Sequence, residues 1–235
     1  MNFSTKKHVF FDLDNTLWDH RANSEKALKS IFEEQEITQR FDLSFDEWHP
    51  VFYEKNEVLW ALLRDKEINK DQLRERRFTK PFAFFDIDEP ELCQFFDAEY
   101  LERMKHQTGL VEGAVQLLDF LKPNHILHII TNGFEEVSTH KVENSALKGY
   151  FTTLTCADEI NVRKPDPKIF DHALNKAGAA KEDSLLIGDD LVADIVGAIE
   201  YGMDTIFLNV FDEHFTFENV PQVKKLEEIK PYFQP

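Results

Sequence analysis

From about residue 125 onward, short apolar runs rich in β-branched residues alternate with segments of helical period. HILHIIT (125–131) and DSLLIGD (183–189) have the character of buried strands, and PKIFDHALNKAG (167–178) that of a helix ending at its glycine. Such alternation predicts parallel βαβ units, and therefore an α/β fold with a doubly wound parallel sheet. Further strands are expected at 9–11, 150–156 and 204–209, and further helices at 135–147 and 191–202.

Between about residues 17 and 105 the pattern changes. SEKALKSIFEEQ (24–35), EVLWALLRD (57–65) and ELCQFFDAEYLERM (91–104) are helical in period, and almost nothing in this stretch resembles a strand. A helical block placed directly after the first strand of a sheet indicates an insertion. The sequence therefore predicts an all-helical cap inserted into the α/β core.

The domain boundaries follow from these changes of pattern. We expect the α/β core at 1–16 and 108–235 and the helical cap at 17–107. Near the end of the chain, PQVKKLEEIKPYF (221–233) is compatible with either a short edge strand or a helix. The choice between these two stays open from the sequence.

The chain is strongly acidic, with 27 lysines and arginines against 44 aspartates and glutamates and a formal charge of −17. Such a field repels nucleic acid polymers and anionic membrane surfaces, so neither is expected as a partner. It also repels a small anionic substrate, which would need a local cation in its site. The partner we expect is therefore a small molecule bound beside a lysine or arginine.

The two cysteines, Cys93 and Cys156, stand in unlike contexts and lack metal-ligand spacing. They predict two buried thiols in a reducing compartment. The N-terminus has no long apolar stretch, and no run of eighteen apolar residues occurs in the chain. We expect a monomeric, cytoplasmic protein.

The motif DLDNT (12–16) places two carboxylates directly after the first apolar run. Residues two apart in an extended chain point to the same side, so Asp12 and Asp14 can face one site at the carboxyl end of the strand. Ligands bind at this edge of open parallel sheets. The ordinary alternative is that these residues only end the strand and cap the next helix.

Three more polar clusters follow strands of the same predicted sheet. ITNGF brings Thr131 and Asn132 to a helix N-terminus, where a hydroxyl and backbone N–H groups suit a phosphate. VRKPDP places Lys164 in a loop that opens a helix, and IGDDLVAD places acids after a buried strand. Alone, each has a bland explanation: a turn, a solvated lysine, or acids that answer a helix dipole. Together they supply carboxylates, a hydroxyl and a cation at one edge of a sheet.

This ordered set of motifs resembles the haloacid dehalogenase superfamily, in the branch with a helical cap between the first and second motifs. The resemblance covers residues 8–19 and about 110–210. It implies that Asp12 is a nucleophile, that Asp14 is an acid/base, and that Thr131, Asn132 and Lys164 bind phosphate. Dehalogenating members lack an aspartate at the position of Asp14, so its presence implies phosphoryl transfer.

The resemblance also implies a magnesium ion. Its ligands would be the carboxylates of Asp12 and Asp189 and the main-chain carbonyl of Asp14, an all-oxygen set of the kind that Mg²⁺ prefers. Asp190 and Asp194 are expected behind these groups, fixing Lys164 or water on the metal. Asp194 is the stronger candidate of the two.

The helical insert bears on the leaving group. The stretch 56–78, with TNGF and KPDPKIFDHALNKAG, resembles house-cleaning 5′-nucleotidases, which act on nucleoside monophosphates and especially on pyrimidine ones. The expected function is therefore a Mg²⁺-dependent phosphatase with an aspartyl-phosphate intermediate and a helical lid. The ordinary alternative is that the cap candidates are core or surface residues. The candidate contacts to the leaving group are Trp18, Asn56, Trp60, Arg77 and Phe78.

Other functions on the same core stay open. A phosphomutase would share every core motif, and a phosphatase for sugar phosphates or other metabolites would differ only in the cap. A dehalogenase is disfavoured by Asp14. A silent binding module is disfavoured because every expected catalytic position carries a suitable residue.

Overall fold

The structure is a computed structural model, and it describes residues 1–234. These residues form two compact units. One unit comprises Met1–His20 and the chain from Thr108 onward, and the other comprises Arg21–Gln107. The first holds the strands of the described chain, and the second holds helices and their connections. They are named the α/β unit and the helical unit below.

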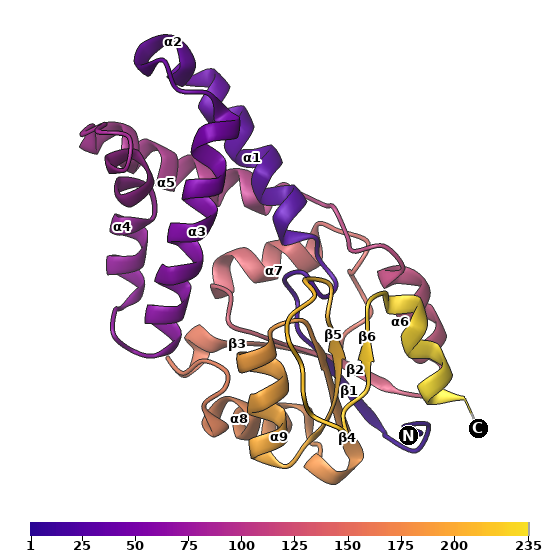
Figure 1. Cartoon of the computed structure of the whole chain (residues 1–235). Helices are drawn as coiled ribbons and strands as arrows, with labels where there is room; N and C mark the ends of the chain where they lie inside the picture. Colours follow the sequence, from indigo (N-terminus) through magenta and orange to yellow (C-terminus); the bar gives the residue numbers. More distant parts are fainter. Residues whose placement is uncertain (235) are drawn as a thin grey trace. The chain divides into compact units, whose positions relative to one another are not determined.

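The α/β unit is built on a parallel sheet. Its six described strands pair in the order β3–β2–β1–β4–β5–β6, and every pair is parallel. The chain winds outward from β1 to β3 and then returns to β4 on the other side of β1, so the winding reverses between β1 and β4 (Figure 1). The strands are His8–Phe11 (β1), Ile126–Thr131 (β2), Thr153–Cys156 (β3), Ser184–Gly188 (β4), Asp204–Leu208 (β5) and Gln222–Val223 (β6).

Helices lie on both sides of this sheet (Figure 1). No described helix of the protein combines the length and the apolar character that a membrane span requires. The helices of the α/β unit are α6 (Ala114–Leu121), α7 (Glu135–Glu143), α8 (Pro167–Ala177), α9 (Gly197–Tyr201), the short 3₁₀ turns η1 (Ala157–Glu159) and η2 (Lys181–Asp183), the π-helix η3 (Leu191–Val196) and the 3₁₀ helix η4 (Leu226–Phe233).

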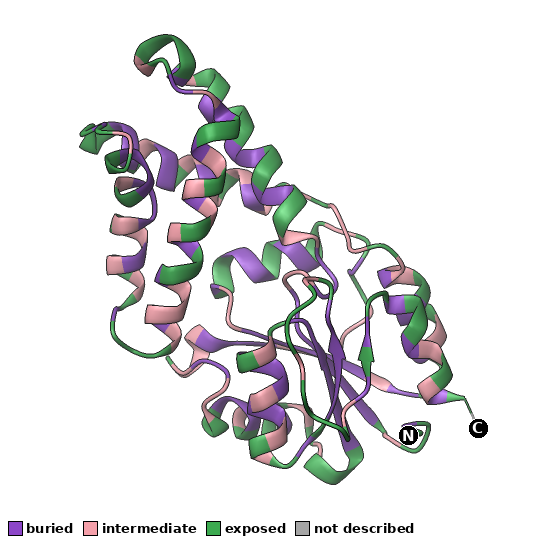
Figure 2. Ribbon diagram, in the orientation of Figure 1, coloured by how far each residue is buried: buried purple, intermediate pink, exposed green. Residues whose placement is uncertain are grey.

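The strands at the centre of the sheet are buried on both faces, as parallel sheets require (Figure 2). On one face, Phe10 of β1, Ile130 of β2 and Leu186 of β4 pack in one cluster with Phe170 of α8 and Ala198 of α9. Buried carbon of this kind stabilises a fold by about 25 cal/mol per Å² removed from water. The packing fixes the register of β1 between its neighbours, and so fixes the point at which each strand ends.

The helical unit consists of helices with clear sequence signals at their starts. Ser44 and Asn69 each form a capping box with the residue three positions on, which satisfies N–H groups that the first turn leaves without partners. The helices are α1 (His20–Glu34), α2 (Ile37–Phe41), α3 (Phe45–Arg64), α4 (Lys70–Ala83) and α5 (Pro90–Lys105).

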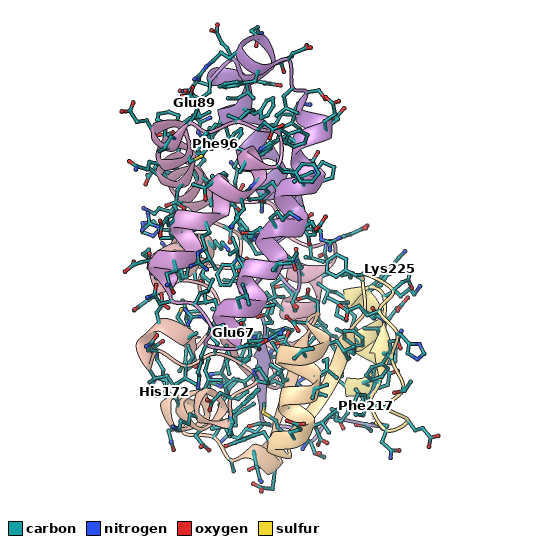
Figure 3. The ribbon with its side chains drawn as sticks, turned by 60° about the vertical axis from the view of Figure 1, so that its left-hand side comes forward. Glu67, Glu89, Phe96, His172, Phe217 and Lys225 are labelled. Carbon is teal, nitrogen blue, oxygen red and sulfur yellow. The ribbon has the colours of Figure 1, made fainter. Side chains whose placement is uncertain are left out.

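An aromatic cluster forms the core of the helical unit. Trp48 is buried, and its ring centroid lies 5.2 Å from that of Phe52, 5.1 Å from that of Phe82 and 5.7 Å from that of Phe96. Phe96 lies among the side chains of these helices (Figure 3). Rings at 4.5–7 Å gain roughly 0.5–1.5 kcal/mol beyond their area burial. Part of the phenylalanine content of this chain therefore serves packing between the helices of this unit.

The α/β class and the doubly wound parallel sheet are confirmed, two helices differ from expectation, and the open choice at 221–233 is resolved. The helix expected at 135–147 ends at Glu143, and the one expected at 191–202 is a π-helix followed by the short α9. The segment 221–233 contains both alternatives, the short edge strand β6 and then η4. A π-helix leaves no sequence signature that apolar periodicity would detect.

A buried pair of histidines joins two central strands. His8 Nδ1 lies 3.0 Å from His128 Nε2, and His128 Nδ1 lies 2.8 Å from Thr153 Oγ1. Burial, assisted by the neighbouring His8, lowers the pKa of His128 from 6.5 to about 4. Between pH 6.5 and about 4, His128 is therefore mostly neutral in the folded protein, whereas the same side chain is mostly protonated in the unfolded chain.

This pair predicts a pH-dependent stability. Between pH 6.5 and 4 the unfolded state binds more protons than the folded state, so the free energy of unfolding falls as the pH falls. His128→Gln keeps a donor and an acceptor but does not titrate. We expect the loss of stability between pH 7 and pH 5, measured by urea unfolding, to be about 2 kcal/mol smaller in this variant. Equal losses in His128→Gln and the wild type would contradict this account.

Candidate active site

The candidate site lies where the winding of the sheet reverses. Asp12 directly follows β1 and Asp189 directly follows β4, and these two strands are neighbours. The ladder continues one step past β1, because Asp12 N–H donates to Ile187 O at 2.9 Å. Ligands bind at the carboxyl ends of strands beside such a reversal. The sheet therefore places two carboxylates at the position where an α/β fold builds a site.

A buried lysine holds the centre of this site. Lys164 is 1% exposed, and its Nζ donates to Asp12 Oδ1 at 2.6 Å, to Asp194 Oδ1 at 2.6 Å and to Ile130 O at 2.8 Å. All three donors of the ammonium group are thus used. Burial opposes its charge, but the two carboxylates outweigh burial and raise the pKa of Lys164 above its ordinary range. Lys164 is a fixed cation.

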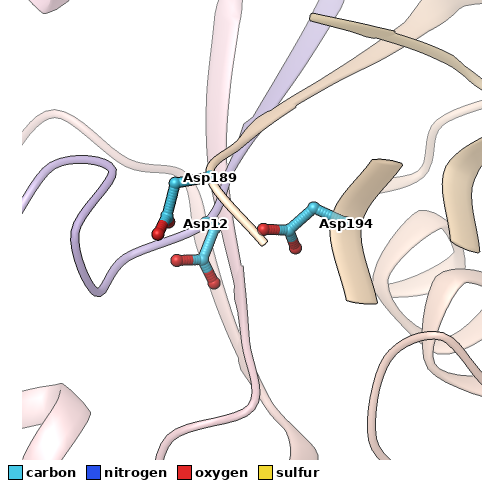
Figure 4. Close-up of side chains that lie close together, drawn as sticks. All are labelled: Asp12, Asp189 and Asp194. Carbon is cyan, nitrogen blue, oxygen red and sulfur yellow. The ribbon is translucent and has the colours of Figure 1, made fainter. Parts of the chain in front are cut away.

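One ammonium group cannot neutralise the carboxylates around it. Asp12, Asp189 and Asp194 each offer an oxygen within 4.8 Å of the others (Figure 4). Burial, together with Asp194 and Asp14, raises the pKa of Asp12 to about 7 against the opposing effect of Lys164. Burial and the neighbouring Asp12 and Asp194 raise the pKa of Asp189 well above its ordinary value. The cluster is short of positive charge.

The turn after β4 explains the position of Asp194. Asp190 Oδ1 accepts hydrogen bonds from the N–H groups of Val192 and Ala193, which caps the π-helix. The wider π turn then directs Asp194 back to Lys164, and Asp194 Oδ2 accepts from Asp190 N–H at 3.1 Å. Gly188 is required here, because a Cβ at this position would lie 2.3 Å from Asp194 Oδ2. Asp190 therefore acts on the helix start and Asp194 on the lysine.

The turn after β2 is tightly packed around Gly133. Thr131 Oγ1 accepts from Gly133 N–H at 3.0 Å. A Cβ at Gly133 would lie 2.7 Å from Ser138 Oγ, 3.2 Å from Thr131 Oγ1 and 3.4 Å from Asp14 Oδ2. Glycine is therefore the residue that lets this turn approach both the Thr131 hydroxyl and the Asp14 carboxylate. The turn lies just before the N-terminus of α7, where N–H groups suit an anion.

Asn132 joins this turn to the loop of Lys164. Its Nδ2 donates to Lys164 O at 3.0 Å, and its Oδ1 accepts from Lys164 N–H at 2.7 Å. Both ends of the amide are therefore engaged with the main chain of one residue. The role expected for Asn132 was phosphate binding, and the side chain is placed to fix the loop that carries the cation.

Asp14 belongs to a network that the sequence did not reveal. Lys141, which is buried on α7, places Nζ 2.5 Å from Asp14 Oδ1 and 4.3 Å from the ring centroid of Trp18. His20 Nδ1 lies 3.4 Å from the same oxygen. Burial would raise the pKa of Asp14, but Lys141 and His20 outweigh it and hold that pKa well below its usual range. Asp14 is an anchored carboxylate in this structure.

Lys141 could have been found from helical spacing. Val137, Ser138 and Lys141 lie on the buried face of α7, so a lysine occupies an otherwise inward position. A buried lysine almost always has a charged partner. Thr16 was missed as well: its Oγ1 donates to Asp189 Oδ1 at 2.7 Å, two positions beyond Asp14 in the same motif.

Four of the five candidate contacts to the leaving group lie in the helical unit. Arg77 is buried, with Nη2 3.2 Å from Asp97 Oδ1 and its guanidinium carbon 5.4 Å from the ring centroid of Tyr100. Phe78 belongs to the aromatic core, and Trp60 is half-buried. Asn56 is buried, and its Oδ1 has no hydrogen-bond partner among the described residues. Trp18 lies in the α/β unit, under Lys141.

The donor set at the strand ends fits a divalent cation. Of the three clustered carboxylates, Asp194 has both oxygens engaged, by Lys164 and by the Asp190 N–H group. Asp12 and Asp189 each keep one oxygen that takes no hydrogen bond from the described part of the chain. Carboxylate oxygens with an excess of negative charge are what Mg²⁺ binds. The raised pKa values of both groups show how strongly this place favours an added positive charge.

Comparison with known proteins identifies the family. The family model for haloacid dehalogenase-like hydrolases matches residues 6–202, which covers both the first strand and the end of α9. The chain belongs to the haloacid dehalogenase-like hydrolases. The resemblance found in its motifs is thereby confirmed, and the cluster around Lys164 lies within the matched region.

Two relatives of this chain are pyrimidine 5′-nucleotidases by name. The chain is 30% identical over 228 residues to the pyrimidine 5′-nucleotidase PynA of Streptococcus pneumoniae, covering 96% of this chain and 92% of that one. It is 31% identical over 202 residues to the pyrimidine 5′-nucleotidase YjjG of Escherichia coli, covering 86% and 85%. A crystal structure of the HAD-hydrolase YfnB of Bacillus subtilis bound to magnesium has the same fold, with a TM-score of 0.87 and 24% identity over 97% of this chain and 98% of that one.

The contacts of Asp194 and Asp190 predict that the two acids contribute differently to stability. Both oxygens of Asp194 accept hydrogen bonds, so an amide at this fully buried position would face one donor with another. Asp194→Asn should lower the free energy of unfolding by about 2–3 kcal/mol, since buried groups hydrogen-bonded to a charge cost this much to disrupt. Asp190→Asn removes the same charge but keeps a good helix cap, and it should change stability by less than about 0.5 kcal/mol. Urea unfolding of the two metal-free variants measures this difference. Equal losses in the two would contradict the assigned contacts.

Proposed function

We propose that this chain is a magnesium-dependent phosphatase that hydrolyses small phosphomonoesters through a phosphoryl group carried on Asp12. Nucleoside 5′-monophosphates, with pyrimidine bases favoured, are its proposed substrates. The observation that carries the proposal is the buried Asp12 carboxylate, held by Lys164 and facing Asp189 at the reversal of a parallel sheet. A nucleophile, a cation and a metal-ligating acid are the parts that phosphoryl transfer requires.

The first step is attack on phosphorus. Asp12 Oδ2 takes no hydrogen bond from the described residues, and this oxygen is the proposed nucleophile, while Oδ1 stays on Lys164. Attack on a phosphate is opposed by charge, since one like-charged pair at ~4 Å costs on the order of 4 kcal/mol at an effective dielectric of about 20. Lys164 offsets part of this cost. The Thr131 hydroxyl, in the turn at Gly133, is proposed to hold a phosphate oxygen in line with attack.

Asp14 serves both halves of the reaction. In the first, the bond from Asp12 to phosphorus forms, the bond to the leaving oxygen breaks, and Asp14 gives that oxygen its proton. Asp14 is proposed to carry this proton when substrate is bound, because the negative charge of the phosphate opposes the ionised form of the carboxyl group. In the second, Asp14 takes a proton from water, the water oxygen bonds to phosphorus, and the bond to Asp12 breaks. Acid/base help of this kind contributes typically ~10²–10⁴-fold. The position of Asp14 Oδ2 beside the Gly133 turn supports this role.

The metal is proposed to be held by the carboxylates of Asp12 and Asp189 and the main-chain carbonyl of Asp14. Bound there, Mg²⁺ supplies positive charge that neutralises the phosphate and orients it. The all-oxygen donor set, the excess of carboxylates and the magnesium-bound YfnB structure support the choice of metal. Thr16, through its bond to Asp189, is proposed to fix one ligand.

Metal binding gives a prediction with two independent measurements. Chelation should abolish hydrolysis, and added Mg²⁺ should restore it, whereas Ca²⁺ should substitute poorly because it favours more ligands in looser geometry. Mg²⁺ should also raise the melting temperature of the protein, since binding to the folded state stabilises it. Asp189→Asn should lose most of this thermal shift and Asp190→Asn should keep it. Full activity in a metal-stripped sample would contradict the proposal.

The substrate class rests on the relatives and on a division of labour. PynA and YjjG are pyrimidine 5′-nucleotidases by name. The groups around Lys164 concern phosphate and metal, so they cannot distinguish one leaving group from another. We propose that the helical unit, Arg21–Gln107, supplies that selection. More distant relatives are named N-acylneuraminate-9-phosphatase, so phosphorylated sugar acids are the second class to test.

A substrate panel tests this proposal. We expect kcat/KM to be highest for UMP, dUMP or dTMP, with AMP, glucose 6-phosphate and a phosphorylated sugar acid lower. A stacked base contributes ~1–3 kcal/mol, which gives roughly tenfold to hundredfold selection. Asp12→Asn is the control for contaminating phosphatases and should lose turnover on every substrate. A non-nucleotide that exceeds the best nucleotide by more than about tenfold would overturn the substrate class, since stacking on the base could not then be the source of selection.

A further inference from the structure

We propose that Lys141 is a positioning residue for Asp14. It holds one carboxylate oxygen so that the other faces the turn of Thr131 and Gly133. This inference rests on the proposed phosphatase function and adds to it a residue on α7 that lies outside the four sequence motifs.

The two oxygens of Asp14 have different surroundings. Oδ1 is held by Lys141 Nζ at 2.5 Å and has His20 Nδ1 at 3.4 Å. Oδ2 lies beside the Gly133 turn, 3.4 Å from the place that a Cβ on Gly133 would take, and takes no hydrogen bond from the described residues. The anchored oxygen fixes the plane of the carboxyl group, and the free oxygen is the one that can exchange a proton with a bound phosphomonoester.

Lys141 is a costly residue to keep at this position. It is 3% exposed, and removing an ammonium group from water is strongly unfavourable unless the charge is paired. Its partners are the carboxylate of Asp14 and the face of Trp18, which attracts a cation at this distance. Trp18 and Asp14 lie in one turn after β1, so Lys141 ties α7 to the chain segment that carries Asp14.

The chemical consequence concerns the leaving group. When the phosphorus–oxygen bond breaks, the leaving oxygen must take a proton from Asp14 Oδ2 unless it is stable as an anion. A misplacement of about 1 Å can cost a hundredfold in rate, so an unanchored Asp14 should transfer this proton slowly. Oδ1 accepts from Lys141 whether or not Oδ2 carries a proton, so the anchor persists through both halves of the reaction.

The test compares two leaving groups in the intact, Mg²⁺-loaded enzyme. A nucleoside monophosphate releases an alkoxide that needs a proton, whereas 4-nitrophenyl phosphate releases an anion that does not. For Lys141→Met we expect kcat/KM on the nucleotide to fall ~30–100-fold, against less than about threefold on 4-nitrophenyl phosphate. The reason is that kcat/KM reports the first half of the reaction, in which only the leaving oxygen of the nucleotide needs a proton from Asp14. Lys141→Arg, which keeps the charge, should recover most of the loss.

Lys148 provides the matched control. It is an exposed lysine beyond the end of α7, paired with Glu143, and Lys148→Met should leave both rates unchanged. An equal loss on both substrates, or no loss on either, would overturn the positioning role, because a purely structural residue does not distinguish leaving groups. If Lys141→Met fails to fold, Lys141→Gln is judged by the same ratio of rates.

The outcome separates the two proposals. A wild-type enzyme that prefers other alkyl phosphates would overturn only the nucleotide preference, and the ratio is then measured on the best of those alkyl phosphates. A wild-type enzyme that cleaves no phosphomonoester would overturn both proposals. A selective loss on the poorer leaving group, restored by Lys141→Arg, is the result that supports the role of Lys141.

Discussion

The buried ammonium group of Lys164 is the interaction on which the site depends. Its three N–H groups donate to Asp12 after β1, to Asp194 in the π-helix after β4, and to Ile130 O near the end of strand β2. One lysine thereby ties together three neighbouring regions of the sheet edge. A buried ammonium group is stable only where carboxylates pair with it, and loss of one partner of a buried ion pair costs roughly 3–5 kcal/mol in other proteins. The turns after β1 and β4 bring these carboxylates to Lys164.

The same lysine sets the electrostatic condition for function. It satisfies one oxygen of Asp12 and one of Asp194, and leaves the cluster with more carboxylate than ammonium. The raised pKa values of Asp12 and Asp189 express that imbalance. An added cation relieves it, and a phosphate dianion then meets positive charge in an otherwise acidic protein. The same charge balance within the site therefore supports both the proposed metal and the proposed anionic substrate.

The sequence predicted those parts of the site that depend on strand ends. Asp12 and Asp189 could be placed because apolar runs show where strands stop, and parallel strands end at one edge. The partners of Asp14 could not be placed, because helical spacing shows that Lys141 faces inward but not which carboxylate it meets. The side chain of Asn132 is engaged with the main chain of Lys164, a contact that closes only in three dimensions. The π-helix was not predicted either, because apolar periodicity in the sequence does not reveal it.

The helical unit was predicted in its helices and less well in its side chains. Its aromatic spacing indicated packing, and Phe78 indeed lies in the aromatic core around Trp48. The charge pattern suggested that Arg77 would be a surface or substrate-facing group, yet it is buried beside Asp97 and Tyr100. The spacing of a charged residue along a helix does not show whether its side chain faces solvent or a buried partner. Selection of the leaving group is consequently the part of the account that sequence supports least directly.

The most direct test of the central claim is to trap the phosphoryl group on the enzyme. Acid quenching during turnover, followed by borohydride reduction, converts an aspartyl-phosphate to homoserine, which peptide mass spectrometry assigns to a position. The account predicts homoserine at residue 12, formed only when substrate and Mg²⁺ are both present. Reduction at a different carboxylate, or none at residue 12 under conditions that trap a known aspartyl-phosphate enzyme in parallel, would contradict the assignment of Asp12 as the nucleophile.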